Sequence, residues 1–183
     1  MQNIIGDQTL YETKPDQANR SLIEMETYAL LEKLGIPYFR LDHAETPSIE
    51  AAYEVEKLLE IEICKNLFLC NSQKTNYYLL MMPGRKKFRT KELSKQINSS
   101  RLSFAEAEEM EKHLKIKPGS VSVLGLMNDE SNHVQLLIDR EVLHSEYLGC
   151  HPCVNTSSLK LRTSDLLTKF LPYIGHEPIM VEL

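Results

Sequence analysis

No apolar run in the sequence approaches the ~20 residues that a membrane-spanning helix needs. The first 7 residues also lack the basic region and apolar stretch that open a secretory signal. A glycine-rich phosphate loop, a dinucleotide-binding fingerprint and the glycine-flanked serine of a hydrolase elbow are absent. These absences argue against several membrane, secreted and nucleotide-binding classes, and we expect a cytoplasmic protein.

Cysteine is scarce, with 4 residues in a chain of 183. Without a secretory signal, we expect reduced thiols rather than disulfides. Hydrophobic residues make up 42% of the chain and charged residues 26%, which is close to the globular average and sufficient for a sizeable core. The length fits one domain, which we expect over residues 20–183, after an N-terminal extension of residues 1–19.

Hydrophobic periodicity and turn signals predict an α+β fold, a single domain with a central mixed β-sheet flanked by helices. The expected helices are residues 21–34, 46–59, 90–97, 103–114 and 163–174. The expected strands are residues 37–41, 66–70, 77–82 and 134–138, with one or two more within 150–161. The strands 66–70 and 77–82 are expected to form an antiparallel hairpin.

Helix ends are predicted from capping residues and helix breakers. Ser103 and Glu106 are interpreted as a capping box that begins the fourth helix, and Pro118 with Gly119 as its end. The other predicted starts are Thr46 with Pro47, and Thr163 or Ser164.

Lys65 and Asn66 lie at the start of an apolar strand, where lysine is unusual because an unpaired buried charge is costly. Lys65 is either the solvated start of the strand or a cation aimed into a cleft, where it would bind a phosphate or polarise an ester. The loop from Gly119 to Val123 is a second candidate, because successive N–H groups in a glycine-containing turn form oxyanion pockets. An ordinary connection between helix and strand is the alternative for this loop.

Cys150 and Cys153 have redox-motif spacing, with His151 between them. A thioredoxin-like site requires the motif to open a helix, whereas the residues that follow look extended. A zinc site needs about four ligands, and no second pair with metal spacing is present. We therefore expect no metal or cofactor and interpret His151, held beside Pro152, as a hydrogen-bonding group that lines a cleft. His43 follows a predicted strand and either faces the cleft or caps the sheet edge.

Basic residues are concentrated between positions 85 and 91, in a chain whose net charge is −5. The net charge argues mildly against indiscriminate nucleic-acid binding, but the local distribution of charge decides that question. The tract is either a solvated face or the place where a phosphate backbone lies. Its basic residues are Arg85, Lys86, Lys87, Arg89 and Lys91.

Five segments, taken in order, resemble the superfamily of YbaK-type and prolyl-tRNA synthetase-associated editing domains. They are DHAET at 42–46, KNLFL at 65–69, the tract after Pro118 and Gly119, LMND at 126–129, and GCHP at 149–152 with Asn155 and Thr156. The resemblance covers residues 20–174 and is greatest to the free-standing deacylases of alanyl-tRNA(Pro). It implies an α+β editing domain that hydrolyses the ester of mischarged alanyl-tRNA(Pro) in trans. Its implied partner is tRNA(Pro) charged with alanine, with prolyl-tRNA synthetase as a second candidate.

The resemblance also implies roles for residues of this chain. Lys65 matches the central lysine of the family, and His151 matches the histidine of its later cleft motif. The expected catalytic residues are Lys65, Asn66, Gly119 and His151. The expected substrate-binding residues are His43, Ser120, Val121, Ser122 and Val123, and the basic residues of 85–91 are expected to contact the acceptor stem of tRNA. In the expected mechanism, water attacks the ester while Lys65 and the loop N–H groups stabilise the developing charge.

Two other functions stay open at this point. One is a deacylase for another small amino acid, serine or cysteine. The other is a non-catalytic homologue that binds tRNA or a synthetase. Val123 favours the second, because the glycine loop of the family usually closes with a proline at that position.

Overall fold

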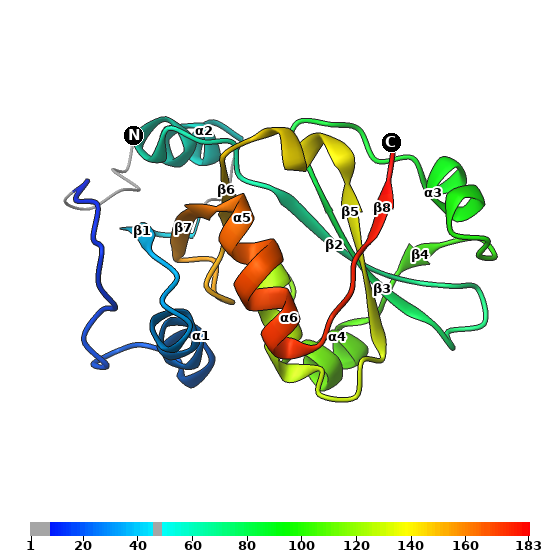
Figure 1. Cartoon of the computed structure of the whole chain (residues 1–183), viewed down its shortest axis with the longest axis horizontal. Helices are drawn as coiled ribbons and strands as arrows, with labels where there is room; N and C mark the ends of the chain where they lie inside the picture. Colours follow the sequence, from blue (N-terminus) through cyan, green and yellow to red (C-terminus); the bar gives the residue numbers. More distant parts are fainter. Residues whose placement is uncertain (1–7, 46–48) are drawn as a thin grey trace.

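The computed structural model describes residues 8–45 and 49–183. Within these ranges the strands form two sheets, one of three strands and one of five (Figure 1). The smaller sheet has the order β1-β7-β6 and is antiparallel throughout. Its strands are β1 (Tyr38–Asp42), β6 (Tyr147–Cys150) and β7 (Ser157–Arg162).

The larger sheet has the order β4-β2-β3-β5-β8 and is mixed. Its strands are β2 (Lys65–Cys70), β3 (Tyr77–Met82), β4 (Ser103–Phe104), β5 (Val134–Asp139) and β8 (Ile179–Val181). Strands β2 and β3 form the predicted antiparallel hairpin, whereas β5 is parallel to both β3 and β8. The prediction of an α+β fold with a central mixed sheet is confirmed.

The helical segments surround these sheets. They are α1 (Leu22–Lys33), α2 (Ile49–Leu59), α3 (Thr90–Gln96), α4 (Ala107–Leu114), η1 (Val123–Asn128), η2 (Arg140–His144), α5 (Thr163–Asp165), η3 (Leu166–Phe170) and α6 (Leu171–Ile174). None of the helices in the described ranges is long and apolar enough to cross a membrane.

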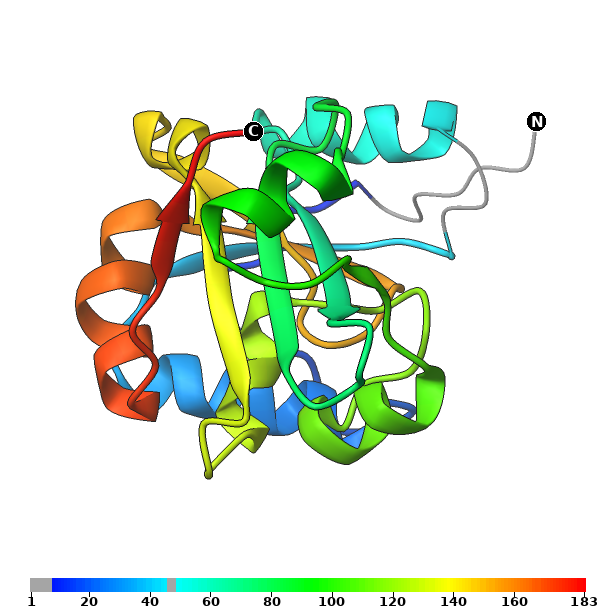
Figure 2. The same cartoon turned by 90° about the vertical axis from the view of Figure 1, so that its right-hand side faces the viewer.

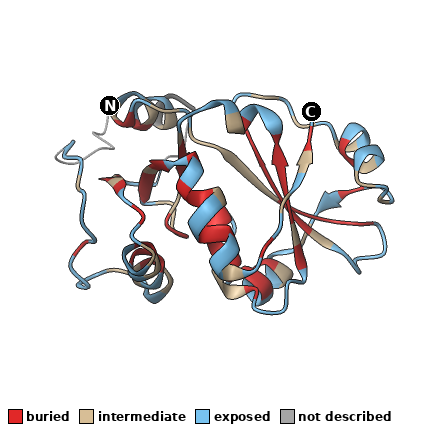
Figure 3. Ribbon diagram, in the orientation of Figure 1, coloured by how far each residue is buried: buried red, intermediate tan, exposed pale blue. Residues whose placement is uncertain are grey.

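Both faces of the five-stranded sheet are buried, because alternate side chains of its strands enter different clusters. Leu79 and Met81 of β3 belong to the larger cluster, to which α1, α4, η1 and the smaller sheet contribute. Leu80 and Met82 belong to a second cluster, which Leu93 of α3 covers. Figure 2 shows α3 lying over the face of the sheet that is turned toward the viewer, and Figure 3 shows the buried residues concentrated along the central strands.

The two sheets meet at a short parallel bridge between Ile63 and Gly149. The backbone N–H of Cys64 donates to the carbonyl of Gly149 over 2.9 Å. A Cβ on Gly149 would displace the end of the Ile61 side chain and lie 3.0 Å from the Cα of Ile63, so glycine favours this close approach. The start of β2 therefore lies beside the end of β6, and this junction positions the site.

The predicted start of the fourth helix is wrong, whereas its predicted last residue, Leu114, is confirmed. Ser103 pairs with Cys70 in β4, and the helix begins only at Ala107, because the edge of the sheet takes up the backbone of the preceding residues. The helix ends at Leu114, whose carbonyl accepts a hydrogen bond from the Asn128 side chain. Pro118 and Gly119 lie beyond this end and do not form it.

The last helix also differs from the prediction, in its start and in its interior. Thr163 does not cap it, since its hydroxyl donates to the carbonyl of Ser145 over 2.7 Å. The middle turn, η3, is a wider π-turn just before Pro172, whose missing N–H removes one helical hydrogen bond. The predicted helix start at Thr46 and Pro47 lies outside the described residues.

The described part of the N-terminal extension is attached to the smaller sheet. Tyr11 and Arg40 of β1 exchange two backbone hydrogen bonds, of 2.9 and 2.7 Å. The guanidinium of Arg40 also lies over the ring of Tyr11 and donates to the carbonyl of Thr13. This part of the extension therefore packs as an additional edge on β1.

Candidate functional site

A pocket of about 710 Å³ opens where the two sheets meet, below α2. Helix α2 forms one wall, and the start of β2 and the segment after β3 form another. Residues that follow β1 and β6 close its base. The described lining residues are His43, Ala52, Tyr53, Glu54, Val55, Glu56, Ile63, Cys64, Lys65, Gly84, Arg85, His151 and Ser158.

Lys65 is partly buried in this pocket rather than extended into solvent. It begins β2 opposite Met82, so the strand pairing fixes its backbone. Its ammonium group donates to the backbone carbonyl of Lys86 over 2.9 Å. No carboxylate within the described ranges forms an ion pair with Lys65. The pocket therefore contains a cation that a carbonyl oxygen orients and no carboxylate neutralises.

His151 follows β6 and contributes an imidazole to the same pocket. Its Nδ1 lies 2.9 Å from the carbonyl oxygen of Ser157. A carbonyl only accepts, so Nδ1 carries the hydrogen, and the lone pair of Nε2 has no hydrogen-bond partner among the described residues. Burial lowers the pKa of His151, although the bond to Ser157 opposes this, so the ring is neutral at neutral pH. A neutral imidazole with an open Nε2 is able to accept a proton.

His43 lies across from His151, with the two ring centroids 6.4 Å apart. Its Nδ1 donates to the carbonyl of Ala44 over 2.8 Å, and its Nε2 lies 2.9 Å from the Ser158 hydroxyl. Burial lowers the pKa of His43 as well. Because both ring nitrogens already have partners, His43 is suited to fixing a wall of the pocket rather than to exchanging protons.

Comparison with known proteins assigns this architecture to a family. The model of the aminoacyl-tRNA editing domain matches residues 43–169, a span that runs from His43 through Lys65 and His151. The chain belongs to the aminoacyl-tRNA editing domain family. This confirms the resemblance found in the sequence and the expected enzyme class, a hydrolase of the aminoacyl ester of tRNA.

Individual relatives support the same assignment. The prolyl-tRNA editing protein ProX of Acetoanaerobium sticklandii is 34% identical over 142 residues, which cover 75% of this chain and 84% of the relative. A prolyl-tRNA synthetase associated domain-containing protein of Danio rerio is 27% identical over 161 residues, covering 87% and 86%. The solved structure of a candidate trans-editing enzyme for prolyl-tRNA synthetase shares the fold, with a TM-score of 0.63 at 15% identity over 90% of this chain and 99% of that one.

The structure brings only some of the predicted site residues of this editing domain to the pocket. Lys65, His151 and His43 line it, and so does Arg85 of the basic tract. Asn66 does not line the pocket. Its amide group donates to the carbonyl of Cys64 over 3.1 Å, and its Oδ1 is buried without a hydrogen bond in the described structure.

The loop from Gly119 to Val123 lies behind His151 and is not part of the pocket wall. Ser122 donates to the carbonyl of His151 over 2.6 Å and accepts from the N–H of Leu124, which begins η1. Val123 is completely buried in the main core, Ser120 is buried as well, and Val121 packs against the core. Gly119 has a φ of +88°, a conformation that favours glycine. This geometry makes the loop a support for His151.

Most of the basic tract is paired with carboxylates. Arg85 lies 3.1 Å from Glu56, and Arg89 lies 3.0 Å from Glu92. Lys86 is held by two carboxylates at 2.8 Å, those of Asp139 and Glu141. Lys87 and Lys91 are exposed and form no ion pair within the described ranges. As a predicted tRNA contact, the tract therefore offers fewer unpaired cations than its sequence suggests.

The cysteines of the domain have no redox geometry. All four are free, and burial raises the pKa of Cys153 to about 12 and that of Cys150 well above its ordinary value. Cys64 lines the pocket, but burial raises its pKa to about 12 too. A thiolate nucleophile is therefore disfavoured at neutral pH.

Tyr53, Glu56 and Ser158 are among the pocket residues that sequence reasoning missed. Tyr53 and Glu56 are three residues apart on α2 and so share a helix face, a spacing that is visible in the sequence. Arg85 lies over the ring of Tyr53, 5.7 Å from its centroid, and pairs with Glu56. Nothing in the sequence singles out Ser158, because its contact with His43 depends on the pairing of β1 with β7.

Proposed function

We propose that this chain is a trans-editing deacylase that hydrolyses the ester of mischarged alanyl-tRNA(Pro). One observation carries the proposal: the same pocket of an aminoacyl-tRNA editing domain contains an oriented cation and a neutral imidazole. The cation is Lys65, and the imidazole is that of His151. The relative in Acetoanaerobium sticklandii is named as a prolyl-tRNA editing protein, which supports tRNA(Pro) as the carrier.

Lys65 is proposed to stabilise the charge that develops on the ester carbonyl oxygen. A cation already oriented by the Lys86 carbonyl needs little rearrangement during the reaction, and such preorganised electrostatic contacts typically change rates by ~10²–10³. The predicted N–H groups of the Gly119–Val123 loop are assigned a supporting role instead, since the loop contacts His151 through Ser122.

His151 is proposed to activate the water that attacks the ester. Its Nε2 takes one proton from the water as the new carbon–oxygen bond forms. The carbon–oxygen bond to the ribose then breaks, and the imidazolium returns the proton to the ribose oxygen that leaves. The products are free alanine and tRNA with an intact terminal hydroxyl. No cofactor or metal takes part in this scheme.

The entrance of the pocket is proposed to hold the single-stranded acceptor end of tRNA. Tyr53 is 54% exposed there, and bases of single-stranded RNA stack on aromatic and guanidinium groups. Arg85 lies next to Tyr53 and forms an ion pair with Glu56. A phosphate of the tRNA is proposed to compete with the Glu56 carboxylate for the Arg85 guanidinium. The interior is apolar where Val55 and Ile63 line it, which suits the methyl group of alanine. A larger proline ring is proposed to be excluded by its size.

We also propose residues 20–183 as the editing domain and residues 1–19 as an extension of it. Arg20 supports this boundary, because it pairs with Asp42 over 2.6 Å just before His43. The described part of the extension is accordingly expected to stabilise β1 without entering the pocket.

The test is hydrolysis by the purified chain of tRNA(Pro) charged separately with alanine, proline, serine and cysteine. We expect alanine to be released far faster than the spontaneous rate and proline to be retained. Preferential release of serine or cysteine would show that tRNA(Pro) charged with that amino acid, rather than with alanine, is the substrate. Release of none of the four would favour a non-catalytic tRNA-binding protein.

A further inference from the structure

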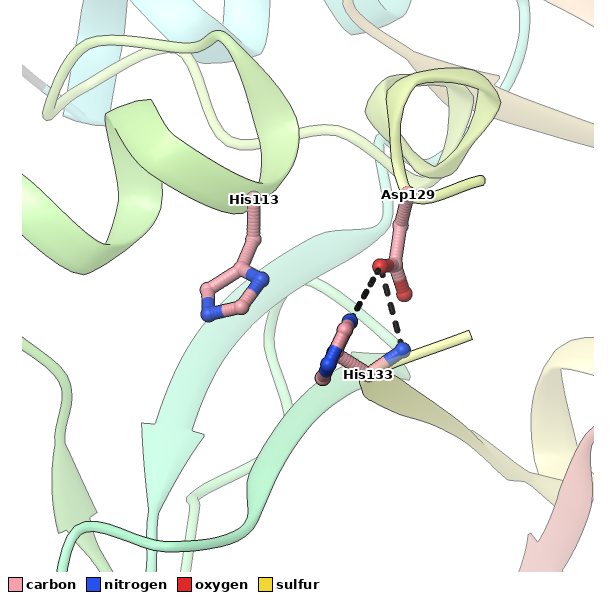
Figure 4. A group of neighbouring side chains, drawn as sticks. All are labelled: His113, Asp129 and His133. Carbon is pink, nitrogen blue, oxygen red and sulfur yellow. Dashed lines mark hydrogen bonds and ion pairs between the residues drawn. The ribbon is translucent and has the colours of Figure 1, made fainter. Parts of the chain in front are cut away.

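Three side chains with metal-binding atoms gather at the end of the central sheet that is remote from Lys65. They are His113 in the last turn of α4, Asp129 after η1, and His133 before β5. One ligand atom from each lies within 4.8 Å of the other two (Figure 4). Lys65 pairs with Met82 at one end of β3, whereas Val134, next to His133, pairs with Tyr77 at the other. A strand of this length separates the two places by about 17 Å.

Asp129 is buried and held in one orientation. Its Oδ1 accepts the backbone N–H of His133 over 3.1 Å, and its Oδ2 accepts that of Val134 over 2.7 Å. Each carboxylate oxygen has a further lone pair for a cation. His133 Nδ1 lies 3.9 Å from Oδ1, too far for a hydrogen bond but within the span that a bridging ion closes.

His113 is buried, and its Nε2 has no hydrogen-bond partner within the described ranges. This nitrogen lies 3.2 Å from the carboxylate of Glu109, one turn earlier on α4. Figure 4 shows one ring nitrogen of His113 turned toward Asp129 and His133 and the other turned away. Since Nε2 lies beside Glu109, Nδ1 is the nitrogen that faces the cluster. Metal-ligating histidines usually direct their second nitrogen to a carboxylate in this way.

We propose that His113, Asp129 and His133 bind a divalent transition-metal ion of the Zn²⁺ type. Two imidazoles and one carboxylate are a donor set that Zn²⁺ accepts, whereas Ca²⁺ and Mg²⁺ prefer oxygen ligands alone. Zinc–ligand bonds of about 2.0–2.2 Å require the three donor atoms to come closer together than 4.8 Å. His133 allows this, because its side chain is 63% exposed and free to rotate inward.

The three residues help to line a pocket of about 540 Å³, and the fourth coordination position of the ion faces this pocket. A water molecule from the pocket serves as the fourth ligand. The bound ion joins α4 to the beginning of β5, a strand of the sheet against which α4 packs. Its role is to stabilise this end of the fold, because the site is remote from Lys65. This inference departs from the expectation that the chain binds no metal, and it does not depend on the proposed function.

The test uses the full-length chain, stripped of metal with a chelator and titrated with Zn²⁺ in a calorimeter. We expect one equivalent to bind and the midpoint of thermal unfolding to rise. His133→Asn should weaken binding at least about tenfold, since removing even a group that only orients a ligand typically costs 10–100-fold. His144→Asn is the matched control, because His144 is also an exposed histidine but lies outside the cluster, and it should bind Zn²⁺ like the wild type.

Two results would overturn the proposal. One is the absence of stoichiometric Zn²⁺ binding by the wild type. The other is an unchanged affinity in both His133→Asn and a second variant, His113→Gln. Because His133 is exposed, its variant should fold normally, and circular dichroism of each variant verifies this. Loss of binding in the control as well would place the ion elsewhere.

Discussion

His151 and His43 differ in how many of their ring nitrogens are already hydrogen-bonded. His43 uses both, with Ala44 and Ser158, whereas the Nε2 of His151 has no hydrogen bond to the described residues. Two histidines whose ring centroids are 6.4 Å apart therefore have different capacities, one to hold the pocket wall and one to accept a proton. Under the proposed function, this difference would make His151 the catalytic histidine and His43 a positioning residue.

The role proposed for His151 predicts a specific pH profile. Burial lowers the pKa of His151 from 6.5. The imidazole therefore stays uncharged, and able to accept a proton, as the pH falls to a value below 6.5. The kcat/KM for alanyl-tRNA(Pro) should rise with pH on an acid limb centred below 6.5 and then level off. His151→Ala should lower kcat by ~10²–10⁴ and remove this limb. An identical acid limb in the variant would assign it to another group, and His144→Ala serves as the control.

Ser122 is the residue through which the glycine loop acts on His151. Its buried hydroxyl donates to the His151 carbonyl and accepts from Leu124, so Ser122→Ala removes two hydrogen bonds at once. We expect a loss of about 1–3 kcal/mol in the free energy of unfolding, measured by urea denaturation. Deacylation should also slow, because His151 is no longer held from behind. Ser131→Ala, at an exposed position, should change neither quantity.

At the scale of elements, the pocket depends on the close approach of two segments beside β2. Gly84 lies against the backbone carbonyl of Ile63, and a Cβ at this position would clash with it. Gly84→Ala should therefore push the segment after β3 away from β2 and cost about 1–3 kcal/mol of stability. Urea denaturation measures this cost. A variant as stable as the wild type would show that the two segments separate easily.

Elements with a strong local signal were predictable from the sequence, and those defined by pairing were not. The hairpin of β2 and β3 follows from two apolar runs and a polar turn, and α1 follows from the helical spacing of apolar residues within 21–34. Strand β4 has two residues, and β8 has three, so neither carries a periodic pattern. The second sheet likewise could not be predicted, because β1 pairs with β7, a strand that is distant from it in sequence.

The same limit applies to the site. Lys65 stands out in the sequence because a charge begins an apolar strand. His43 and His151 meet in the pocket only because β1 and β6 both pair with β7. The position of Val123 in the core, and not in the pocket, depends on how η1 packs beneath the smaller sheet. Long-range packing of this kind leaves no pattern in one sequence.

At the scale of the whole molecule, buried histidines connect stability to pH. Burial lowers the pKa of His43, His151 and His176 below 6.5 in the folded state. The unfolded chain therefore takes up protons first as the pH falls, and the folded state loses stability below 6.5. Above that pH the contribution of these groups is complete. Thermal unfolding followed from about pH 8 to about pH 5 should show the midpoint decline below about 6.5, and a constant midpoint would contradict this account.

Binding of tRNA should depend on the unpaired cations more than on the total charge of the basic tract. Lys87 and Lys91 form no ion pair within the described ranges, so the double variant Lys87→Glu/Lys91→Glu should weaken tRNA binding and reduce its salt dependence. The slope of log affinity against log salt should fall by roughly one for each phosphate that the variant no longer neutralises. Lys33→Glu on α1 is the control, and equal weakening in that variant would indicate a general effect of charge.

The most direct test of the account is the rate at which Lys65→Ala hydrolyses alanyl-tRNA(Pro) under single-turnover conditions. The comparison is with the wild type and with Lys57→Ala, which removes an exposed lysine of α2. We predict a loss of ~10²–10³ in the hydrolysis rate for Lys65→Ala, with tRNA still bound, and no loss for Lys57→Ala. Hydrolysis by Lys65→Ala at the wild-type rate would contradict the assignment of this pocket as the deacylase site.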